Sequence, residues 1–433
     1  DVLTLGGQGL SAFVGLNGSS PDRLGLSLSG VDFGLALISE KSSSGSGAGR
    51  QWTTLQASAT QTAFVGLGSD LNISASGIQI EVNKVEVGAG PVIDYGTGAT
   101  SLSVATAPDS ALKLSLDGAK GELLQASGHL SLDVYGFVQV AGDLAVSKRT
   151  ETVTLAKKTA SAAAEQVAVD VLTIGGTSLD LFAGVNGGTA DAVGLQLDNV
   201  DFGLALLSDK ANATRSWTAL NVQASSVGFV GLSDLLPTAR NIAVEINQAS
   251  QAGDQVIDFS ARGLSVNTGS GKAVNLDLDG SAGELLRAEG DITLKLFDFA
   301  YVSGRIGFER YTPASDLVLK TASGIGSSVK AQSMLAVTGS QITAFVGYAD
   351  GGFDSDKTLA EQSDRLYGFG ASHVDFGLLL TKSAGQSYTA LKADLGSAAI
   401  YGFNSSDFEL SAQHLILEIN STAGDGSTID YQR

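Results

Sequence analysis

The chain has 433 residues, 43% of them hydrophobic and only 16% charged, which is too apolar for a disordered polypeptide. Its formal net charge of −19 at pH 7 disfavours nucleic acid and anionic lipid as partners. The absence of Cys excludes disulfides, thiolate nucleophiles and Cys-ligated metals. No stretch reaches the roughly 18 consecutive apolar residues of a membrane-spanning helix, so we expect no membrane span.

The chain repeats itself. The segment Val31–Leu37 recurs as Val200–Leu206 and again as Val374–Leu380, which are displaced by 169 and 174 residues. Self-similarity at a fixed period is typical of repeat architectures. The third copy stops soon after its Ile-Asp-Tyr segment, so we expect a longer parent protein. The predicted repeat units are 1–168, 169–333 and a truncated unit at 334–433.

Apolar and polar residues alternate along most of each repeat, which predicts half-buried β-strands. Leu24–Ser29, Leu112–Asp117 and Val274–Asp279 are examples. Turn residues recur at intervals that fit meandering antiparallel strands. Between the first two units, the Ala-rich stretch Lys158–Val169 predicts a short helix. The fold class we expect is all-β: tandem repeats of mainly antiparallel strands, forming an elongated rod or a beaded solenoid or sandwich array.

Some polar and aromatic residues recur in every repeat. An Asp precedes Phe-Gly in each copy of the first segment, and we expect it to make a turn or a hydrogen bond to backbone. A recurring Glu-x-Asn is expected to bond between strands or units. The recurring aromatic residues predict core positions. These sets are Asp32, Asp201 and Asp375; Glu81, Glu245 and Glu418; and Phe33, Trp52, Phe202, Trp217, Phe376 and Tyr388.

The sequence does not predict an enzyme. None of the three His residues recurs, since His129 aligns with Asp291 and His373 aligns with Gly30 and Asn199. No nucleophile elbow, P-loop or zincin motif is present. The least poor enzymatic option is a glycan-active hydrolase with a Glu81–Asp94 type of carboxylate pair. A pair that recurs in every repeat more often serves the fold than a single active site.

Calcium is the one candidate cofactor. Two groups of carboxylates provide the oxygen ligands that calcium prefers, although neither follows the EF-hand spacing or the Gly-rich nonapeptide. The candidate ligands are Asp350, Asp354, Asp356 and Asp364 in one loop, and Asp277, Asp279 and Glu284 near the end of the second unit. Carboxylates of a solvated surface are the alternative interpretation of both groups.

The repeats resemble the repeat regions of giant bacterial surface proteins and large secreted adhesins. The strings Val31–Leu37 and Leu278–Leu286 carry the resemblance, together with the acidic, Cys-free composition. The resemblance implies a location outside the cell or at the bacterial cell surface, an elongated shape and rigidity that depends on calcium. It carries no functional residues across.

The function we expect is structural: a stalk, fibre, filament or matrix element that associates with itself or with neighbouring repeats of the same chain. Exposed sheet edges would allow such assembly. The alternative is an adhesin array that binds a ligand, a surface glycan or a cell-surface partner, with the loop from Asp350 to Asp364 as its contact surface.

Overall fold

A computed structural model describes most of the chain. The residues outside the description are 17–23, 42–48, 66–70, 97–100, 135–136, 158–160, 213, 232–234, 252, 270, 297–298, 312–316, 322–323, 330–332, 356, 384–385, 403–409, 423–426 and 431–433.

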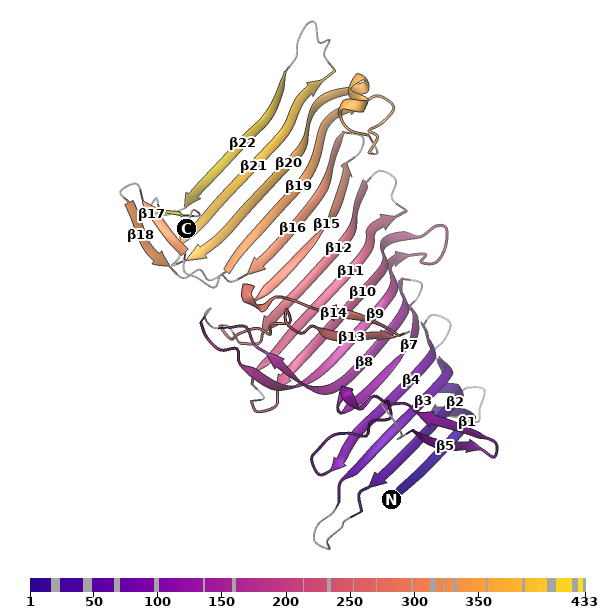
Figure 1. Cartoon of the computed structure of the whole chain (residues 1–433). Helices are drawn as coiled ribbons and strands as arrows, with labels where there is room; N and C mark the ends of the chain where they lie inside the picture. Colours follow the sequence, from indigo (N-terminus) through magenta and orange to yellow (C-terminus); the bar gives the residue numbers. More distant parts are fainter. Residues whose placement is uncertain are drawn as a thin grey trace. The chain divides into compact units, whose positions relative to one another are not determined.

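The expectation of an all-β fold built from antiparallel strands is confirmed. One sheet contains 16 strands in the order β1-β2-β3-β4-β7-β8-β9-β10-β11-β12-β15-β16-β19-β20-β21-β22 (Figure 1). Strands that are adjacent in this order follow one another along the chain, apart from the short elements that the numbering skips. Such a meander needs only local connections. The arrangement as a rod, solenoid or sandwich array stays a prediction.

The strands of the large sheet are mostly long. Their bounds are β1 Val2–Leu16, β2 Leu24–Ser39, β3 Gln51–Val65, β4 Leu71–Val87, β7 Leu123–Val134, β8 Val138–Thr154, β9 Gln166–Val185, β10 Val193–Asp209, β11 Ser216–Val230, β12 Leu235–Ala249, β15 Leu285–Leu296, β16 Ala300–Tyr311, β19 Ser333–Ala349, β20 Leu366–Ser383, β21 Gln386–Tyr401 and β22 Ser411–Thr422.

Shorter elements interrupt the meander, and two sets of them, β5–β6 with η1 and β13–β14 with η2, lie at equivalent places. They are the hairpins β5 Leu102–Ala107 with β6 Ser110–Leu114 and β13 Leu264–Gly269 with β14 Lys272–Leu276; the three strands β17 Leu317–Thr321, β18 Gly324–Val329 and β23 Thr428–Ile429; and the 3-10 turns η1 Gly118–Lys120, η2 Gly280–Ala282 and η3 Ala360–Arg365. The order of four long strands, a hairpin, a 3-10 turn and two long strands therefore occurs twice.

The expected helix at Lys158–Val169 is wrong. Residues 161–165 have no helical structure, and Gln166 begins the long strand β9. The strand wins because Val167, Val169 and Val171 alternate with polar or exposed residues, and each of the three is buried. Alternating burial of β-branched side chains stabilises a strand more than the helix propensity of the preceding Ala residues stabilises a helix.

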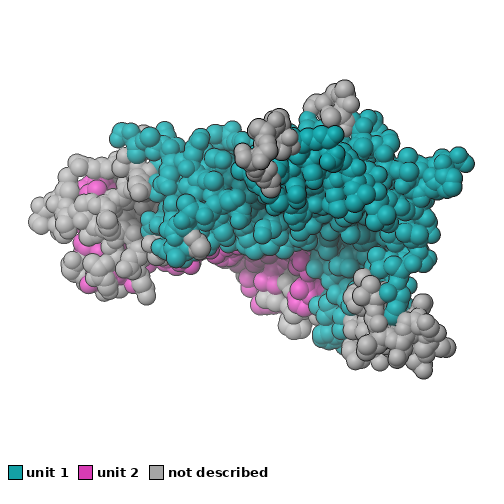
Figure 2. Space-filling model, turned by 90° about the horizontal axis from the view of Figure 1, so that it is seen from below, with its two compact units in different colours: residues 1–190, 198–221, 249–278 teal, residues 191–197, 222–248, 279–433 magenta. Residues whose placement is uncertain are grey.

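The chain divides into two compact units, coloured separately in Figure 2. Unit 1 comprises 1–190, 198–221 and 249–278, and unit 2 comprises 191–197, 222–248 and 279–433. The division of the sequence into repeats at 168 and 333 stays a prediction.

In unit 1, two hairpins pack on one face of the sheet. The β5–β6 hairpin covers β1 and β2, and Val104, Leu114 and Ala36 form a buried cluster there. The β13–β14 hairpin covers β8 and β9, where Val266 and Leu276 are fully buried. Each hairpin therefore supplies a second layer, and the core of the unit lies between that layer and the sheet.

In unit 2, a loop packs on one face of the sheet. Phe353 stacks on Tyr301, with ring centroids 4.2 Å apart, and on Phe345 at 5.4 Å. Leu359 and Leu366 complete this buried cluster. The segment between β19 and η3 thus covers the ends of β16 and β19.

The opposite face, which we call the open face, carries a row of apolar side chains in each unit. Directly paired residues lie on one face of a sheet. In unit 1 the row is Leu5, Leu35, Leu55, Val82, Leu124 and Leu172, with the charged Lys148 between the last two. In unit 2 it is Val244, Ala288, Phe308, Val337, Leu378, Leu391 and Ile419.

The side chains of these rows are half-buried or exposed. Leu124 is 54% exposed, and Phe308 is 47% exposed. The recurring aromatic residues divide between the two faces: Trp52, Trp217 and Tyr388 are buried, whereas Phe33, Phe202 and Phe376 are half-buried. Phe33 and Phe376 lie against Gly7 and Gly339 of the neighbouring strands. The core prediction was therefore right for the first three and wrong for the Phe residues.

Candidate functional site

The recurring Asp residues accept hydrogen bonds from backbone N–H groups at β-bulges; the sequence predicted the hydrogen bond to backbone but not the bulge. Asp32 Oδ1 accepts a hydrogen bond from the Gly9 N–H at 2.7 Å. Asp201 accepts one from the Ser178 N–H, and Asp375 accepts one from the Gln341 N–H, each at 2.7 Å. All three donors have a positive φ, between 52° and 63° for Ser178, Gln341 and Gly9. The carboxylate therefore fixes a backbone conformation that L-residues rarely adopt.

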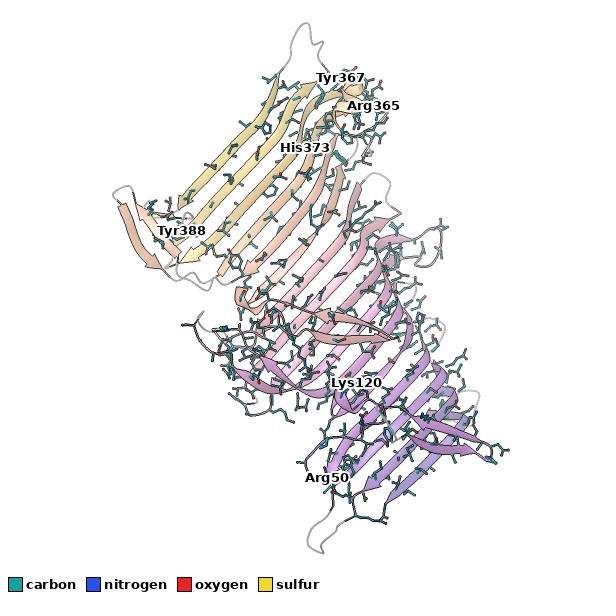
Figure 3. All side chains as sticks on the ribbon, in the orientation of Figure 1. Arg50, Lys120, Arg365, Tyr367, His373 and Tyr388 are labelled. Atoms are coloured by element: carbon teal, nitrogen blue, oxygen red, sulfur yellow. The ribbon has the colours of Figure 1, made fainter. Side chains whose placement is uncertain are left out.

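Two of the three His residues occupy left-handed backbone positions of the same kind. His373 has a φ of 53°, and its repeat equivalents Gly30 and Asn199 have φ values of 60° and 51°. His414 likewise has a φ of 52° at a position where the first repeat has Gly77. Figure 3 labels His373 in the middle of β20. The alignment of His373 with Gly and Asn was the sequence signal for this role.

The third His belongs to a cross-strand pair. His129 on β7 lies opposite Asp143 on β8, with Nδ1 2.9 Å from Oδ1. At the equivalent positions of unit 2, Asp291 lies opposite Arg305, and the Arg305 guanidinium donates to Asp291 at 3.3 Å. The pair is kept while the acidic member changes strand.

The carboxylates of the hypothetical hydrolase pair have separate partners. Glu81 accepts hydrogen bonds from the Gln56 and Gln125 side chains, at 3.2 and 3.3 Å. Asp94 accepts from the backbone N–H groups of Gly96 and Gly118, at 2.9 and 3.1 Å. Glu81 thus links three neighbouring strands, and Asp94 connects the segment after β4 to the start of η1.

The Glu81 position recurs with the same linking role. In unit 2, Glu245 accepts from Arg287 at 3.1 Å, and Arg287 also donates to Glu309 at 2.9 Å. Glu418 makes an ion pair with Lys392 at 3.0 Å. The expectation that the Glu residues bond between strands is therefore confirmed.

The first group of calcium candidates is spread along the loop after β19. The Asp350 N–H donates to the Arg365 carbonyl, and Asp354 forms an ion pair with Lys357 at 3.5 Å. Asp364 is exposed within η3. Asp356 lies outside the described residues. Gln362 and Arg365 hold this loop by hydrogen bonds to its carbonyl groups.

The second group has one clear structural contact. Asp279 Oδ1 caps η2 by accepting from the Ser281 N–H at 2.8 Å. Asp277 is exposed, and Glu284 is half-buried. In the part of the chain that the structure describes, no group of three His, Asp or Glu side chains is close enough to hold a metal ion. Calcium therefore stays a prediction.

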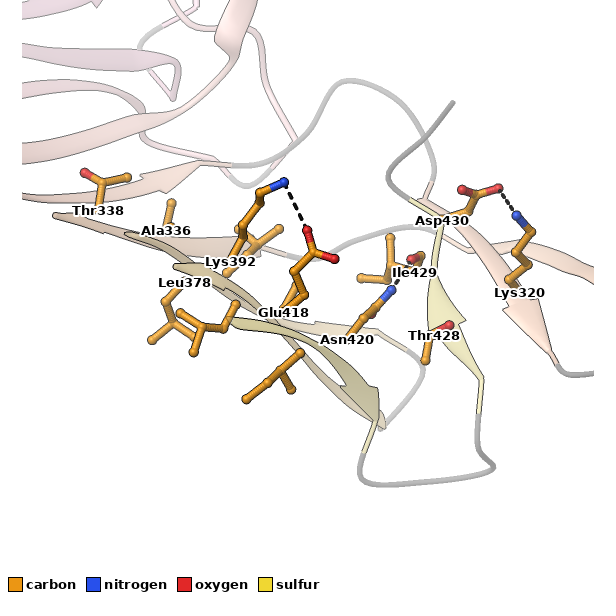
Figure 4. A pocket seen from close by; sticks show the side chains of 15 residues that line it. Lys320, Ala336, Thr338, Leu378, Lys392, Glu418, Asn420, Thr428, Ile429 and Asp430 are labelled. Carbon is orange, nitrogen blue, oxygen red and sulfur yellow. Dashed lines mark hydrogen bonds and ion pairs between the residues drawn. The ribbon is translucent and has the colours of Figure 1, made fainter. Parts of the chain in front are cut away.

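A groove lies over β19–β22 in unit 2, on the face opposite the open face (Figure 4). Its volume is about 740 Å³. The floor is made by Ala336, Thr338, Gly377, Leu379 and Ala390. The sequence analysis did not single out this groove, because no residue of the floor is charged or unusual in type.

The rim of the groove is polar. Lys392 pairs with Glu418 on one side, and Lys320 pairs with Asp430 at 3.3 Å on another. Asn420 Nδ2 donates to the Ile429 carbonyl at 2.9 Å, and this bond fastens β23 beside β22. An apolar floor with a rim of paired charges fits a peptide segment better than a small charged ligand.

Comparisons with known proteins gave no match: no family model, no curated protein and no solved structure is similar to this chain. Among the described residues, no helix has the length and apolar character needed to cross a membrane.

Proposed function

We propose that the chain is a structural segment of an extracellular bacterial surface protein, acting as a stalk, fibre, filament or matrix element. The observation that carries the proposal is the way in which one repeat is joined to the next. The last strand of the first repeat, β8, pairs with the first strand of the second, β9, from Val138↔Ala183 to Thr154↔Gln166. The sheet therefore continues across the junction.

The second junction is built in the same way. β16 pairs with β19 from Ala300↔Val346 to Tyr311↔Met334. A junction made of backbone hydrogen bonds depends little on side chains, so it can be repeated along an array whose loops vary. Stability is then shared between neighbouring repeats.

A second tie reinforces each junction. After β8, Leu155 forms a bridge with Ile257 of the following repeat, and both side chains are at most 1% exposed. After β16, Leu319 of β17 pairs with Ile429 of β23. The connecting segment of one repeat is therefore locked beneath a segment of the next. The location at the cell surface rests on the compositional resemblance alone.

The test is a series of chains that contain residues 1–168, 1–333 and 1–433. A structural array predicts that the midpoint of thermal unfolding rises with each repeat, because each added junction stabilises both of its neighbours. Small-angle scattering should show a maximum dimension that grows by a similar step per repeat. Equal midpoints and no growth in length would contradict the proposal.

Electron microscopy with and without a calcium chelator tests assembly. Filaments or lateral arrays of the whole chain would support the fibre and matrix forms of the proposal, and their loss with chelator would support the calcium expectation. Isolated compact particles that the chelator does not change would overturn both.

Binding is a second candidate function, favoured by one exposed aromatic cluster. Tyr348 and Tyr367 are paired across β19 and β20, with ring centroids 6.2 Å apart. Phe369 lies next to them on the open face, and all three rings are about half exposed, at 49% to 59%. Exposed aromatic side chains are enriched at binding surfaces.

The binding candidate is tested with glycan arrays and the double variant Tyr348→Ala/Tyr367→Ala. A bound glycan that the double variant no longer binds would support this function. Phe308→Ala, an open-face substitution on a different part of the sheet, is the control that should leave binding unchanged.

A further inference from the structure

The groove of unit 2 lies at the position that a hairpin occupies in each half of unit 1. Gly34, Gly203 and Gly377 are equivalent, since each follows the recurring Asp-Phe. A methyl group added to Gly34 would lie 3.1 Å from Leu112 and 3.3 Å from Val104 of the first hairpin. One added to Gly203 would lie 3.1 Å from Val274 and 3.2 Å from Val266 of the second.

At Gly377 the same position is vacant. A methyl group added there would meet no described atom within 4 Å. Gly34 and Gly203 are buried, whereas Gly377 is exposed. The neighbouring floor residues follow the same pattern: Ala36 and Ala205 are fully buried, and their equivalent Leu379 is only half-buried.

The segment that leads to a hairpin is already in place at the rim. In unit 1, Asn83 Nδ2 donates to the Ile93 carbonyl at 2.7 Å, a few residues before the β5–β6 hairpin begins. In unit 2, Asn420 makes the same bond to Ile429 at 2.9 Å. The groove thus has the same floor, and the same bond ahead of it, as the two places where a hairpin packs on the sheet in unit 1.

Two residues of the groove differ from their equivalents in the first repeat, and these differences indicate which segment the groove would bind. Thr338 pairs with Gly377, whereas Gly6 pairs with Gly34. A side chain at Gly6 would overlap the Ala105 carbonyl of the hairpin. A segment in the groove must therefore lie slightly higher over Thr338, where the hydroxyl can donate to the corresponding carbonyl.

The second substitution concerns charge. Gln56 Oε1 accepts from the Ser115 N–H at 2.6 Å just after the first hairpin ends. The equivalent residue in unit 2 is Lys392, which can only donate. The groove therefore favours a hairpin that is followed by an acceptor such as the carboxylate of Asp277, the counterpart of Ser115.

We propose that this groove is a docking site for a β-hairpin of the Leu264–Leu276 kind: two short strands that point Val and Leu side chains at the sheet, followed by an acidic residue. The occupant is inferred from the two equivalent sites of the same chain, each of which holds a hairpin of this kind. The proposal depends on the repeat architecture and is independent of whether the protein acts at a cell surface.

The experiment uses the absence of Cys from the native chain. The chain is extended after Arg433 by a copy of residues 262–282, so that the added hairpin follows the Ile-Asp-Tyr segment at its native spacing. Gly377→Cys is combined with Val274→Cys in the added copy. Beneath the β13–β14 hairpin, the Gly203 and Val274 Cβ positions are 3.1 Å apart, slightly less than the roughly 3.5–4.5 Å of a disulfide, which a segment lying slightly higher over Thr338 would reach.

The matched control places the second Cys at Asn275→Cys of the added copy, because neighbouring residues of a strand face opposite sides. We expect oxidation to form the intrachain disulfide at least about tenfold more with the 274 variant than with the 275 variant, measured by mass spectrometry of tryptic peptides. A tenfold ratio corresponds to about 1.4 kcal/mol.

The crosslink is also measured in a Thr338→Gly background, which removes the side chain that would by itself exclude the hairpin from the groove. Equal disulfide yields at the two positions, in both the native and the Thr338→Gly backgrounds, would overturn the proposal. The result is separate from the test of function: a failed crosslink leaves the repeat-length series unaffected, and constant unfolding midpoints would leave the crosslink intact.

Discussion

At the scale of single residues, the recurring Asp residues and the left-handed residues opposite them form one device. A residue with positive φ breaks the regular ladder, and the carboxylate accepts the N–H that the break leaves unpaired. In the second repeat, Thr177 Oγ1 also donates to Asp201 at 2.6 Å. The bulge thereby fixes the register of the two strands.

Asp201→Ala should lower the free energy of unfolding by about 1.5–3 kcal/mol, because hydrogen bonds to a charged group are lost and the Ser178 N–H loses its partner. Ser178→Gly is the matched control and should be neutral or stabilising by up to about 1 kcal/mol, since Gly adopts positive φ without strain. Chemical denaturation measures both. An Asp201→Ala variant as stable as the native chain would show that the bulge does not need its carboxylate.

Glu40, Arg50 and Trp52 lie together at the end of β2 and the start of β3, and their contacts change the pKa of the Glu40 carboxyl. The Arg50 guanidinium donates two hydrogen bonds to Glu40, at 2.9 and 3.0 Å, and lies over the Trp52 ring at 5.1 Å. These hydrogen bonds, with a third from the Arg50 backbone N–H, lower the pKa of Glu40 from 4.5 to about 2. Figure 3 labels Arg50.

The lowered pKa sets the sign of a pH effect. The stabilising contribution of the charged Glu40 is fully present above pH 4.5 and is lost as the pH falls toward 2. In Arg50→Gln, the pKa of the Glu40 carboxyl should rise toward 4.5, measured by carbon NMR, because the guanidinium is lost and only the backbone N–H of residue 50 still lowers it; Arg50→Lys should raise it less. Identical midpoints in native and Arg50→Gln protein would contradict the assignment.

Sequence reasoning recovered some of these residue roles. The backbone role of Asp32 and its copies was predictable, because a polar residue that recurs inside an apolar strand needs a local partner. The half exposure of Phe33 was not predictable: alternation places it on one face of a strand without telling which face a hairpin covers. The Glu40–Arg50 pair depends on a loop whose length varies between repeats.

At the scale of elements, the two hairpins approach the sheet so closely that glycine is required beneath them. A methyl group on Gly175 would overlap the Asn267 carbonyl, just as one on Gly6 would overlap the Ala105 carbonyl. Backbone cannot move aside as a flexible side chain can, so the layer would have to lift from the sheet.

Gly175→Ala should therefore destabilise the chain by about 1–3 kcal/mol through overpacking. Gly377→Ala is the matched control in the open groove and should change stability by less than about 0.5 kcal/mol. Thermal unfolding of the two variants makes the comparison. A loss in Gly377→Ala as large as that in Gly175→Ala would contradict the close-approach argument.

Element types were largely predictable, and their layering was not. Strict alternation in Leu112–Asp117 predicted strand structure correctly for Leu112 to Leu114, where β6 ends, but not for residues 115–117. Alternation cannot distinguish a strand of the large sheet from one of a hairpin lying on it. The distinction comes from Gly34 and Gly6, whose missing side chains make room for the second layer. The groove was missed for the same reason.

At the scale of the whole molecule, the open face is the feature that most affects behaviour in solution. Rows of apolar side chains cross the strands of each unit, and exposed patches of this kind bind other apolar surfaces. The high net negative charge of −19 opposes aggregation by long-range repulsion, which salt weakens.

The native protein should therefore enhance the fluorescence of an apolar dye such as ANS. Leu124→Lys should reduce the enhancement, and Lys148→Leu, at the directly paired position, should increase it. Far-UV circular dichroism should be unchanged in both variants. Native protein that does not enhance ANS fluorescence would show that the open face is covered in solution.

The reversed order of one cross-strand pair also bears on how similar repeats avoid exchanging strands. If β7 paired with β16, His129 would lose Asp143 as its partner, and if β15 paired with β8, the two carboxylates Asp291 and Asp143 would face each other. Like charges directly opposite each other disfavour a strand pair. Near-identical neighbours in one chain are prone to misassembly during folding. Because the acidic and basic residues exchange strands between repeats, each strand pairs better with its native partner than with the equivalent strand of the neighbouring repeat.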